Sequence, residues 1–159
     1  MRDYDQAQNK KFTYTSNFFD SYIKDSIETA YNFSNSFFAQ KFPANDFYRM
    51  HSFHISAGPQ LGLISGTSAG AGLALCYLSC VLNKKIPRGY AVTGELASSG
   101  QICRVGGIRS KLMAVKENNV SKFFVPIENY QEALDLNIGG IQIIPVKNIA
   151  GLVYDIWRI

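Results

Sequence analysis

The run from Ala71 to Leu82 consists almost entirely of small and apolar residues, and it constrains the fold more than any other stretch. A helix that is apolar on every side has to be buried, so other elements must cover it. The run directly follows a turn of small residues, Gly66-Thr67-Ser68-Ala69-Gly70. We therefore expect a buried helix whose first turn presents one serine.

Helical and strand patterns alternate along most of the chain. Apolar runs and helical spacing predict strands at 47–55, 90–93, 122–125 and 141–145, and helices at 17–38, 107–118, 128–136 and 146–157. A hairpin is expected at 96–105, and Ser16 or Asn17 is expected to cap the first helix. This alternation predicts one α/β domain over 17–159, with a mixed sheet and packed helices. Residues 1–16 are expected to form a loose arm or an added strand.

Composition excludes several classes of protein. The 159 residues can bury a core without disulfides or metals, and the formal charge of +4 is scattered, which gives nucleic-acid binding little support. The three cysteines contain no C-x-x-C pair, so we expect Cys76 and Cys80 to be buried thiols on the apolar helix. The sequence has no run of membrane-spanning length and no signal-like start, so we expect a cytoplasmic protein in a reducing compartment.

Ser68 is a candidate nucleophile. It lies where a glycine-containing turn meets a helix, and free backbone N–H groups at a helix start can stabilise an oxyanion. Gly66 lets the chain turn sharply, and the amides near Thr67, Ser68 and Ala69 are the natural donors. The simpler alternative is a serine that only caps the buried helix.

Lys111 is a candidate general base for that serine. A lysine amine can accept a proton only if its pKa falls from about 10.4 toward neutrality, which burial among apolar groups promotes. Lys111 follows Gly106-Gly107 by about one turn and is flanked by Leu112, Met113 and Val115, which favours an inward-facing amine. A solvated helix lysine is the alternative. Thr93, at the end of a short strand, could supply a hydroxyl that orients the amine.

Four motifs in order carry a resemblance to a known family. They are Gly66-Thr67-Ser68-Ala69-Gly70, Val92-Thr93-Gly94-Glu95, Val105-Gly106-Gly107-Ile108 with Lys111, and Phe124-Val125-Pro126 with Glu128-Asn129. This series resembles the proteolytic domain of the Lon protease family. The resemblance implies that Ser68 is the nucleophile, Lys111 the base and Thr93 the hydroxyl that bonds the lysine. It also matches His54 to a histidine on the strand before the serine loop.

The resemblance implies hydrolysis of peptide bonds in unfolded or extended polypeptide through an acyl-enzyme. Members of the family usually form hexameric rings and carry an ATPase module. No G-x-x-x-x-G-K-[ST] motif occurs here, so no cofactor is expected in this chain and ATP would act only through a separate or missing module. The chain departs from the family pattern at Ser65, where an acid is usual, and at Thr67, where a proline is usual.

Two other functions stay open at this level. A catalytically silent Lon-like module could assemble or regulate an ATPase machine, and it would bind a partner without cleaving any substrate. A self-processing endopeptidase would use the same serine and lysine on a different substrate. Retention of both Ser68 and Lys111 favours a peptidase over the silent module.

Overall fold

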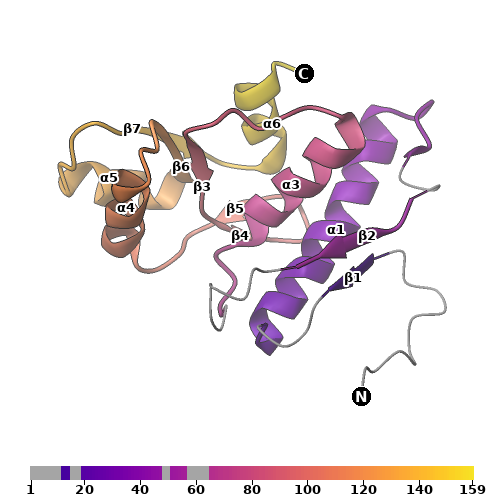
Figure 1. The fold of residues 1–159 in the computed structure, drawn as a ribbon, viewed down its shortest axis with the longest axis horizontal. Helices are drawn as coiled ribbons and strands as arrows, with labels where there is room; N and C mark the ends of the chain where they lie inside the picture. Colours follow the sequence, from indigo (N-terminus) through magenta and orange to yellow (C-terminus); the bar gives the residue numbers. More distant parts are fainter. Residues whose placement is uncertain (1–11, 15–18, 48–50, 57–64) are drawn as a thin grey trace.

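The computed structural model describes residues 12–14, 19–47, 51–56 and 65–159 (Figure 1). One part is built on the long helix α1 (Ser21–Lys41) and the apolar helix α3 (Gly70–Leu82), which lie side by side. The last helix, α6 (Ile149–Trp157), packs on α3 from another direction. Their shared core includes Phe38, Leu78 and Leu152, all at 0% exposure.

A three-stranded parallel sheet forms the other part, in the order β3 (Tyr90–Val92), β6 (Lys122–Pro126), β7 (Gln142–Val146). Ala91 is in register with Phe123, and Phe123 with Ile143. The connections run through α4 (Ile108–Glu117), a short 3-10 turn (Ile127–Asn129) and α5 (Tyr130–Asp135). Parallel strands joined this way have both faces covered by other elements.

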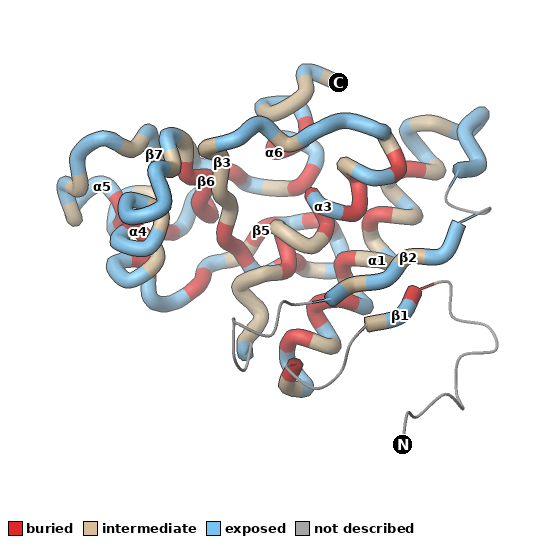
Figure 2. Tube along the Cα trace, viewed as in Figure 1, coloured by how far each residue is buried: buried red, intermediate tan, exposed pale blue. Residues whose placement is uncertain are grey.

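The central strand β6 divides the interior into two cores. Phe124 packs into the core shared with α1, α3 and α6, whereas Phe123 and Val125 pack into a second core with Ile108 and Leu112 of α4. This follows from the alternation of side chains along a strand. Figure 2 shows buried segments in β6 and α3, whereas most of α4 is exposed.

Two smaller strand pairs complete the fold. β1 (Phe12–Tyr14) pairs in parallel with β2 (Phe53–Ile55), and β4 (Glu95–Leu96) pairs antiparallel with β5 (Ile102–Cys103). Phe12–Tyr14 therefore forms the added strand that was one alternative for the first residues. The division into an arm at 1–16 and a domain at 17–159 remains a prediction. The predicted α/β class, with parallel and antiparallel strands and packed helices, is confirmed.

Three local predictions differ from the structure. The strand expected at 47–55 is present only as β2 over 53–55, and residues 48–50 lie outside the described residues. Helix α1 begins at Ser21 with Asp20 as its cap, because the Asp20 side chain accepts a hydrogen bond from the Ile23 amide. The cap predicted at residue 16 or 17 is thus replaced by one in the next turn. Cys76 and Cys80 are exposed rather than buried, because they lie on the face of α3 opposite Ala74 and Leu78.

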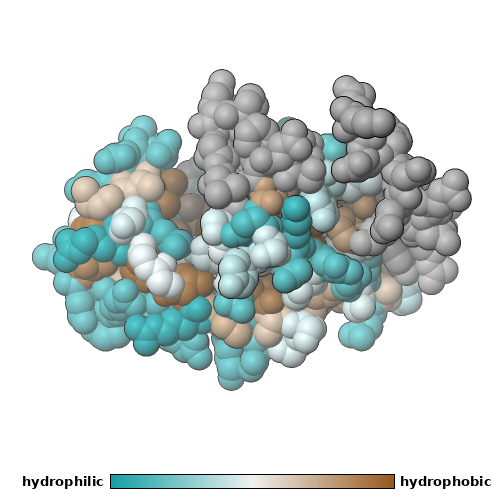
Figure 3. All heavy atoms as spheres, turned by 90° about the horizontal axis from the view of Figure 1, so that it is seen from below, coloured by the Kyte–Doolittle hydropathy of each residue, from teal (hydrophilic) through white to brown (hydrophobic). Residues whose placement is uncertain are grey.

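The outer surface carries scattered apolar groups. Figure 3 shows hydrophilic side chains over much of one face, with smaller hydrophobic areas between them. Exposed large apolar side chains include Tyr22, Met113 and Tyr154, which come from three different helices. Single apolar side chains of this kind are ordinary on soluble proteins. No helix within the described residues has the length and apolar character needed to cross a membrane.

Candidate active site

Ser68 lies in the turn immediately before α3. Ala69, not Ser68, occupies the cap position of the helix, so a capping role does not account for the serine. The carbonyl oxygen of Ser68 accepts hydrogen bonds from the Gly94 amide at 2.9 Å and from the Thr93 hydroxyl at 3.3 Å. Within the described residues, the Ser68 hydroxyl and the Ser68 and Ala69 amides have no hydrogen-bond partner. The turn is therefore fixed through its carbonyl, which leaves the hydroxyl available.

Two glycines allow this turn to pack closely against the segment after β3. A Cβ on Gly70 would lie 2.8 Å from the Leu96 backbone nitrogen, and one on Gly94 would lie 2.2 Å from a methyl carbon of Ile102. Gly94 also has a φ of 157°, which L residues seldom adopt. Without side chains, the two backbones approach closely enough for the Ala71 amide to donate to the Gly94 carbonyl at 3.0 Å.

Lys111 is presented by the first turn of α4. Gly107 precedes that helix with a left-handed φ of 71°, and a Cβ there would lie 3.5 Å from the Lys111 Nζ. Glycine therefore supplies the left-handed turn, and a Cβ at this position would be in ordinary contact with the amine. The amine donates to the Gly106 carbonyl oxygen at 2.8 Å. Among the described residues, no carboxylate lies within ion-pair distance of this amine.

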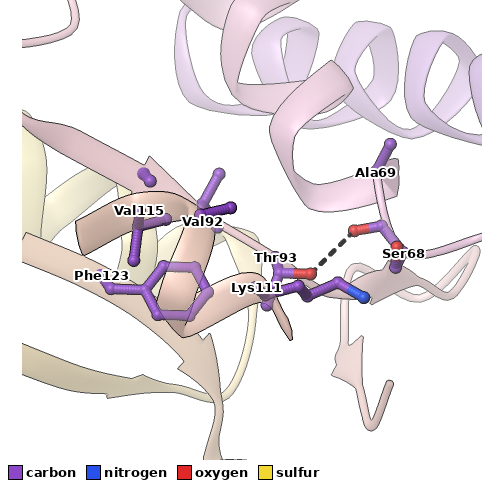
Figure 4. A pocket seen from close by; sticks show the side chains of 9 residues that line it. Ser68, Ala69, Val92, Thr93, Lys111, Val115 and Phe123 are labelled. Carbon is purple, nitrogen blue, oxygen red and sulfur yellow. Dashed lines mark hydrogen bonds between the residues drawn. The ribbon is translucent and has the colours of Figure 1, made fainter. Parts of the chain in front are cut away.

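Ser68, Thr93 and Lys111 line one cavity of about 290 Å³. Its other lining residues are apolar: Ala69, Ala91, Val92, Ala114, Val115 and Phe123. Figure 4 shows the Lys111 side chain extending past Thr93 toward Ser68. Three residues that are far apart in the sequence, from the turn before α3, the end of β3 and the start of α4, therefore meet in one apolar cavity.

The lysine side of the cavity depends on a fully buried asparagine. The Asn129 side chain accepts from the Val105 amide at 2.9 Å and donates to the Val105 carbonyl at 3.0 Å. This pair of bonds fixes the chain two residues before Gly107. Asn129 belongs to one of the four motifs, but its role could not be predicted there, because a contact across 24 positions leaves no local pattern.

Two carboxylates that the sequence analysis also missed hold the serine turn. Thr67 donates to Glu95 Oε2 at 2.7 Å, and the Ser65 hydroxyl donates to Asp20 Oδ2. Thr67 and Ser65 are the two positions at which the resemblance predicts a departure from the family pattern. Each of these hydroxyls bonds to an acid elsewhere in the chain.

The remaining predicted site residues fall in two places. Gly66, with a φ of 88°, and Thr67 lie in the turn that leads to Ser68, and Ala69 lies in the cavity itself. His54 is exposed on β2, where its Nδ1 is 2.8 Å from the Thr13 hydroxyl, and it lines a different cavity of about 380 Å³. The structure does not place His54 with the other site residues, and its role stays a prediction. Within the described residues there is no group of three or more side chains suited to hold a metal.

Comparison with known families agrees with this geometry. Residues 5–156 match the family described as the Lon protease (S16) C-terminal proteolytic domain. The chain belongs to this family, and membership supports a serine peptidase.

Individual relatives give the same result over a shorter span. The chain is 36% identical over 110 residues to the mitochondrial Lon protease homolog of Saccharomyces cerevisiae, an alignment that covers 69% of this chain and 10% of the relative. It is 38% identical over 109 residues to the one of Schizosaccharomyces pombe (67% and 10%), and 34% identical over 114 residues to the one of Caenorhabditis briggsae (72% and 12%). The chain thus spans about a tenth of the length of these relatives. Their mitochondrial names do not fit the cytoplasmic location expected from the sequence.

Proposed function

We propose that this chain is a serine endopeptidase domain that cleaves unfolded or extended polypeptide with Ser68 as nucleophile and Lys111 as general base. The observation that carries the proposal is the apolar cavity of about 290 Å³ shared by Ser68, Thr93 and Lys111. A hydroxyl becomes a useful nucleophile only when a nearby group accepts its proton. Lys111 is the titratable side chain among the lining residues of that cavity.

In the proposed first step, the neutral Lys111 amine takes the proton of the Ser68 hydroxyl while Ser68 Oγ attacks the scissile carbonyl carbon. The amine must first leave the Gly106 carbonyl, which it bonds at 2.8 Å. The resulting tetrahedral intermediate carries an oxyanion. The ammonium of Lys111 then protonates the leaving amine, and the C–N bond breaks to give an acyl-enzyme on Ser68.

The backbone amides at the start of α3 are the proposed oxyanion donors. The Ser68 and Ala69 amides have no partner within the described residues, so they are available to donate hydrogen bonds to the oxyanion as its charge develops. Donors of this kind, fixed before the reaction, stabilise the intermediate without reorganising. Thr93 supports them by holding the Ser68 carbonyl on the opposite side of the turn. The hydrogen bond expected between the Thr93 hydroxyl and the Lys111 amine remains a prediction.

Hydrolysis of the acyl-enzyme repeats the chemistry with water. Lys111 takes a proton from water, the hydroxide attacks the ester carbon, and Ser68 Oγ leaves with the proton that the ammonium returns.

Strand β3 offers the substrate a place to pair. It is an outer strand of its sheet, and Gly89 and Thr93 bond toward β6, so the backbone groups of Tyr90 and Val92 face the other way.

Cleavage of an unstructured protein such as casein tests the proposal. We expect Ser68→Ala and Lys111→Met each to reduce turnover by at least about a thousandfold, because each removes a reacting group. The matched controls are Ser99→Ala, in the hairpin turn, and Lys116→Met, on the same helix as Lys111. Both controls should cleave at the wild-type rate. Undiminished cleavage by Ser68→Ala would contradict the assignment.

One observation favours a second function, the catalytically silent module. The Lys111 amine is engaged by the Gly106 carbonyl in this structure. A protein in which this bond persists would bind partners without cleaving substrate. Absence of cleavage by the wild type under every condition, together with partner binding that survives Ser68→Ala, would favour the module.

We also propose that unfolded substrate reaches the cavity through an ATPase module, a separate or attached one, and that the domain assembles into a ring of identical copies. The support is the family match and the small share of each relative that the chain covers. Analytical ultracentrifugation of the chain tests the ring, and casein cleavage with and without a candidate ATPase tests the delivery of substrate. A chain that stays monomeric at all concentrations would contradict the ring. Casein cleavage that no ATPase accelerates would contradict the delivery.

A further inference from the structure

Asp20 contacts two separate parts of the chain through its two carboxylate oxygens. Oδ1 accepts the Ile23 amide at 2.9 Å and caps α1, while Oδ2 accepts the Ser65 hydroxyl, 45 positions away in the sequence. A single side chain thus joins the start of the longest helix to the turn that carries Ser68. A serine or asparagine cap would stabilise the helix equally well, so capping alone does not require a carboxylate.

The surroundings of Asp20 favour its charged form. The Ser65 hydroxyl lowers the pKa of this carboxyl most, followed by the Ile23 amide, with smaller contributions in the same direction from the Gly66 and Tyr22 amides. The carboxylate is therefore ionised at neutral pH and accepts from both of its neighbours.

The serine turn is fixed on both sides of its centre. Ser65 bonds to Asp20 of α1 on one side, and Thr67 bonds to Glu95 of β4 on the other. Gly66, between them, has a left-handed φ of 88° and nothing within 4 Å of the place of a Cβ. A glycine with open space around it does not restrain the turn, so the Ser65 and Thr67 side-chain bonds add to the hydrogen bonds of the Ser68 carbonyl in limiting its movement.

We propose that Asp20 is a positioning residue that holds the Ser68 turn in its reactive conformation by accepting the Ser65 hydroxyl. This proposal rests on the proposed function, since it assumes that Ser68 is the nucleophile. Asp20 touches no reacting atom, and it acts through the path from Ser65 to Ser68. Removing the bond lets the turn sample conformations in which Ser68 and the proposed oxyanion amides do not face the substrate.

Two variants separate positioning from helix capping. Ser65→Ala removes the hydroxyl and leaves the α1 cap intact. Asp20→Ser keeps a side chain that caps a helix well but has no second oxygen to reach Ser65. Ser36→Ala is the matched control, because the Ser36 hydroxyl lies on the same helix and donates only to Asn32 within it, at 3.1 Å.

Two measurements on the full chain test the proposal. In casein cleavage, we expect Ser65→Ala and Asp20→Ser each to lower kcat by about threefold to tenfold, the effect of one hydrogen bond, with KM little changed. The double variant should be no slower than the slower single variant, because both changes break the same bond. In hydrogen exchange, the Gly70 amide, which donates to the Thr67 carbonyl at 3.1 Å, and the Gly94 amide, which donates to the Ser68 carbonyl at 2.9 Å, should exchange faster in both variants, while the amides of α1 keep their protection. Ser36→Ala should change neither measurement.

Wild-type kcat together with wild-type exchange of the Gly70 and Gly94 amides in Ser65→Ala and Asp20→Ser would overturn the proposal. Losses of kcat that multiply in the double variant would also overturn it, since they would mean that the two residues act independently. Hydrogen exchange can be measured without catalysis, so the positioning role of Asp20 and the proposed peptidase function can be contradicted separately. If the wild type cleaves nothing, the proposed function fails, and the exchange of the Gly70 and Gly94 amides alone then decides whether Asp20 holds the turn.

Discussion

The two halves of the candidate site are held in different ways. The serine half belongs to the core of α1, α3 and α6, and it is fixed by backbone contacts that Gly70 and Gly94 permit. The lysine half belongs to the second core, and it is fixed by one buried side chain, Asn129. The strands β3 and β6 join the halves. The geometry of the cavity therefore depends on two independently packed cores meeting across a short sheet.

Because the two halves are held differently, we expect different kinds of substitution to destabilise each half. Close backbone packing is disturbed by adding even a methyl group, whereas a buried asparagine is disturbed by losing its polar atoms. The serine half should thus be sensitive to small-to-large changes and the lysine half to polar-to-apolar changes.

Asn129→Ala should have the largest effect on stability. It leaves the Val105 amide and carbonyl without their partners in a fully buried position. We expect a loss of about 2–4 kcal/mol in the free energy of unfolding, measured by urea denaturation. Asn118→Ala is the control, because the Asn118 amide group bonds only to the Ala114 carbonyl of its own helix at an exposed site. A loss below about 1 kcal/mol for Asn129→Ala would mean that the lysine half is held by other contacts.

Gly70→Ala tests the close packing of the serine half. Its added methyl would lie 2.8 Å from the Leu96 backbone nitrogen, so the start of α3 must move. We expect a loss of about 1–3 kcal/mol in thermal unfolding. Gly72→Ala, two residues further along α3, meets only a Val92 methyl group at 3.6 Å and should instead stabilise by about 0.5–1 kcal/mol. Equal effects of the two substitutions would contradict the packing argument.

Thr93→Val tests how much the hydrogen bond from the Thr93 hydroxyl to the Ser68 carbonyl contributes to the proposed activity. The change keeps the buried shape of the side chain and removes one hydrogen bond of 3.3 Å. We expect kcat for casein to fall by about threefold to tenfold. Thr93→Ser retains the hydroxyl and should restore most of the activity. A Thr93→Val protein with wild-type kcat would show that the Gly94 amide alone fixes the turn.

The smallest predicted effect is a difference in alkylation rate at a thiol of α3. The two thiols, Cys76 and Cys80, lie on the face of α3 opposite its buried side. Burial raises the pKa of the Cys76 thiol, and the neighbouring Cys80 adds to the rise, even though the Cys76 side chain retains exposed surface. A raised pKa means a smaller thiolate fraction at pH 8, so iodoacetamide should modify Cys76 more slowly than it modifies a free cysteine under the same conditions. Mass spectrometry of the partly alkylated protein measures the rate at Cys76. Modification of Cys76 as fast as that of free cysteine would contradict the assigned environment.

The sequence was sufficient to predict most of the elements and the meeting of Ser68, Thr93 and Lys111 in one place. Periodic apolar residues and glycine turns are local signals, and they predicted α3, α4, β3, β6 and β7 to within a few residues. The contacts of Asp20 with Ser65 and of Asn129 with Val105 could not be predicted, because each joins segments by a single polar side chain. The exposure of Cys76 and Cys80 was missed because an apolar run does not reveal which face of its helix lacks a covering element.

Covalent labelling of Ser68 tests the central claim most directly. A peptide ending in a serine-reactive fluorophosphonate should add one adduct to the wild type, located on Ser68 by mass spectrometry. The account predicts no adduct on Ser68→Ala, a labelling rate at least about a hundredfold lower for Lys111→Met, and an unchanged rate for Lys116→Met. An adduct at another residue, or labelling of Lys111→Met at the wild-type rate, would contradict the proposed pairing of Ser68 with Lys111.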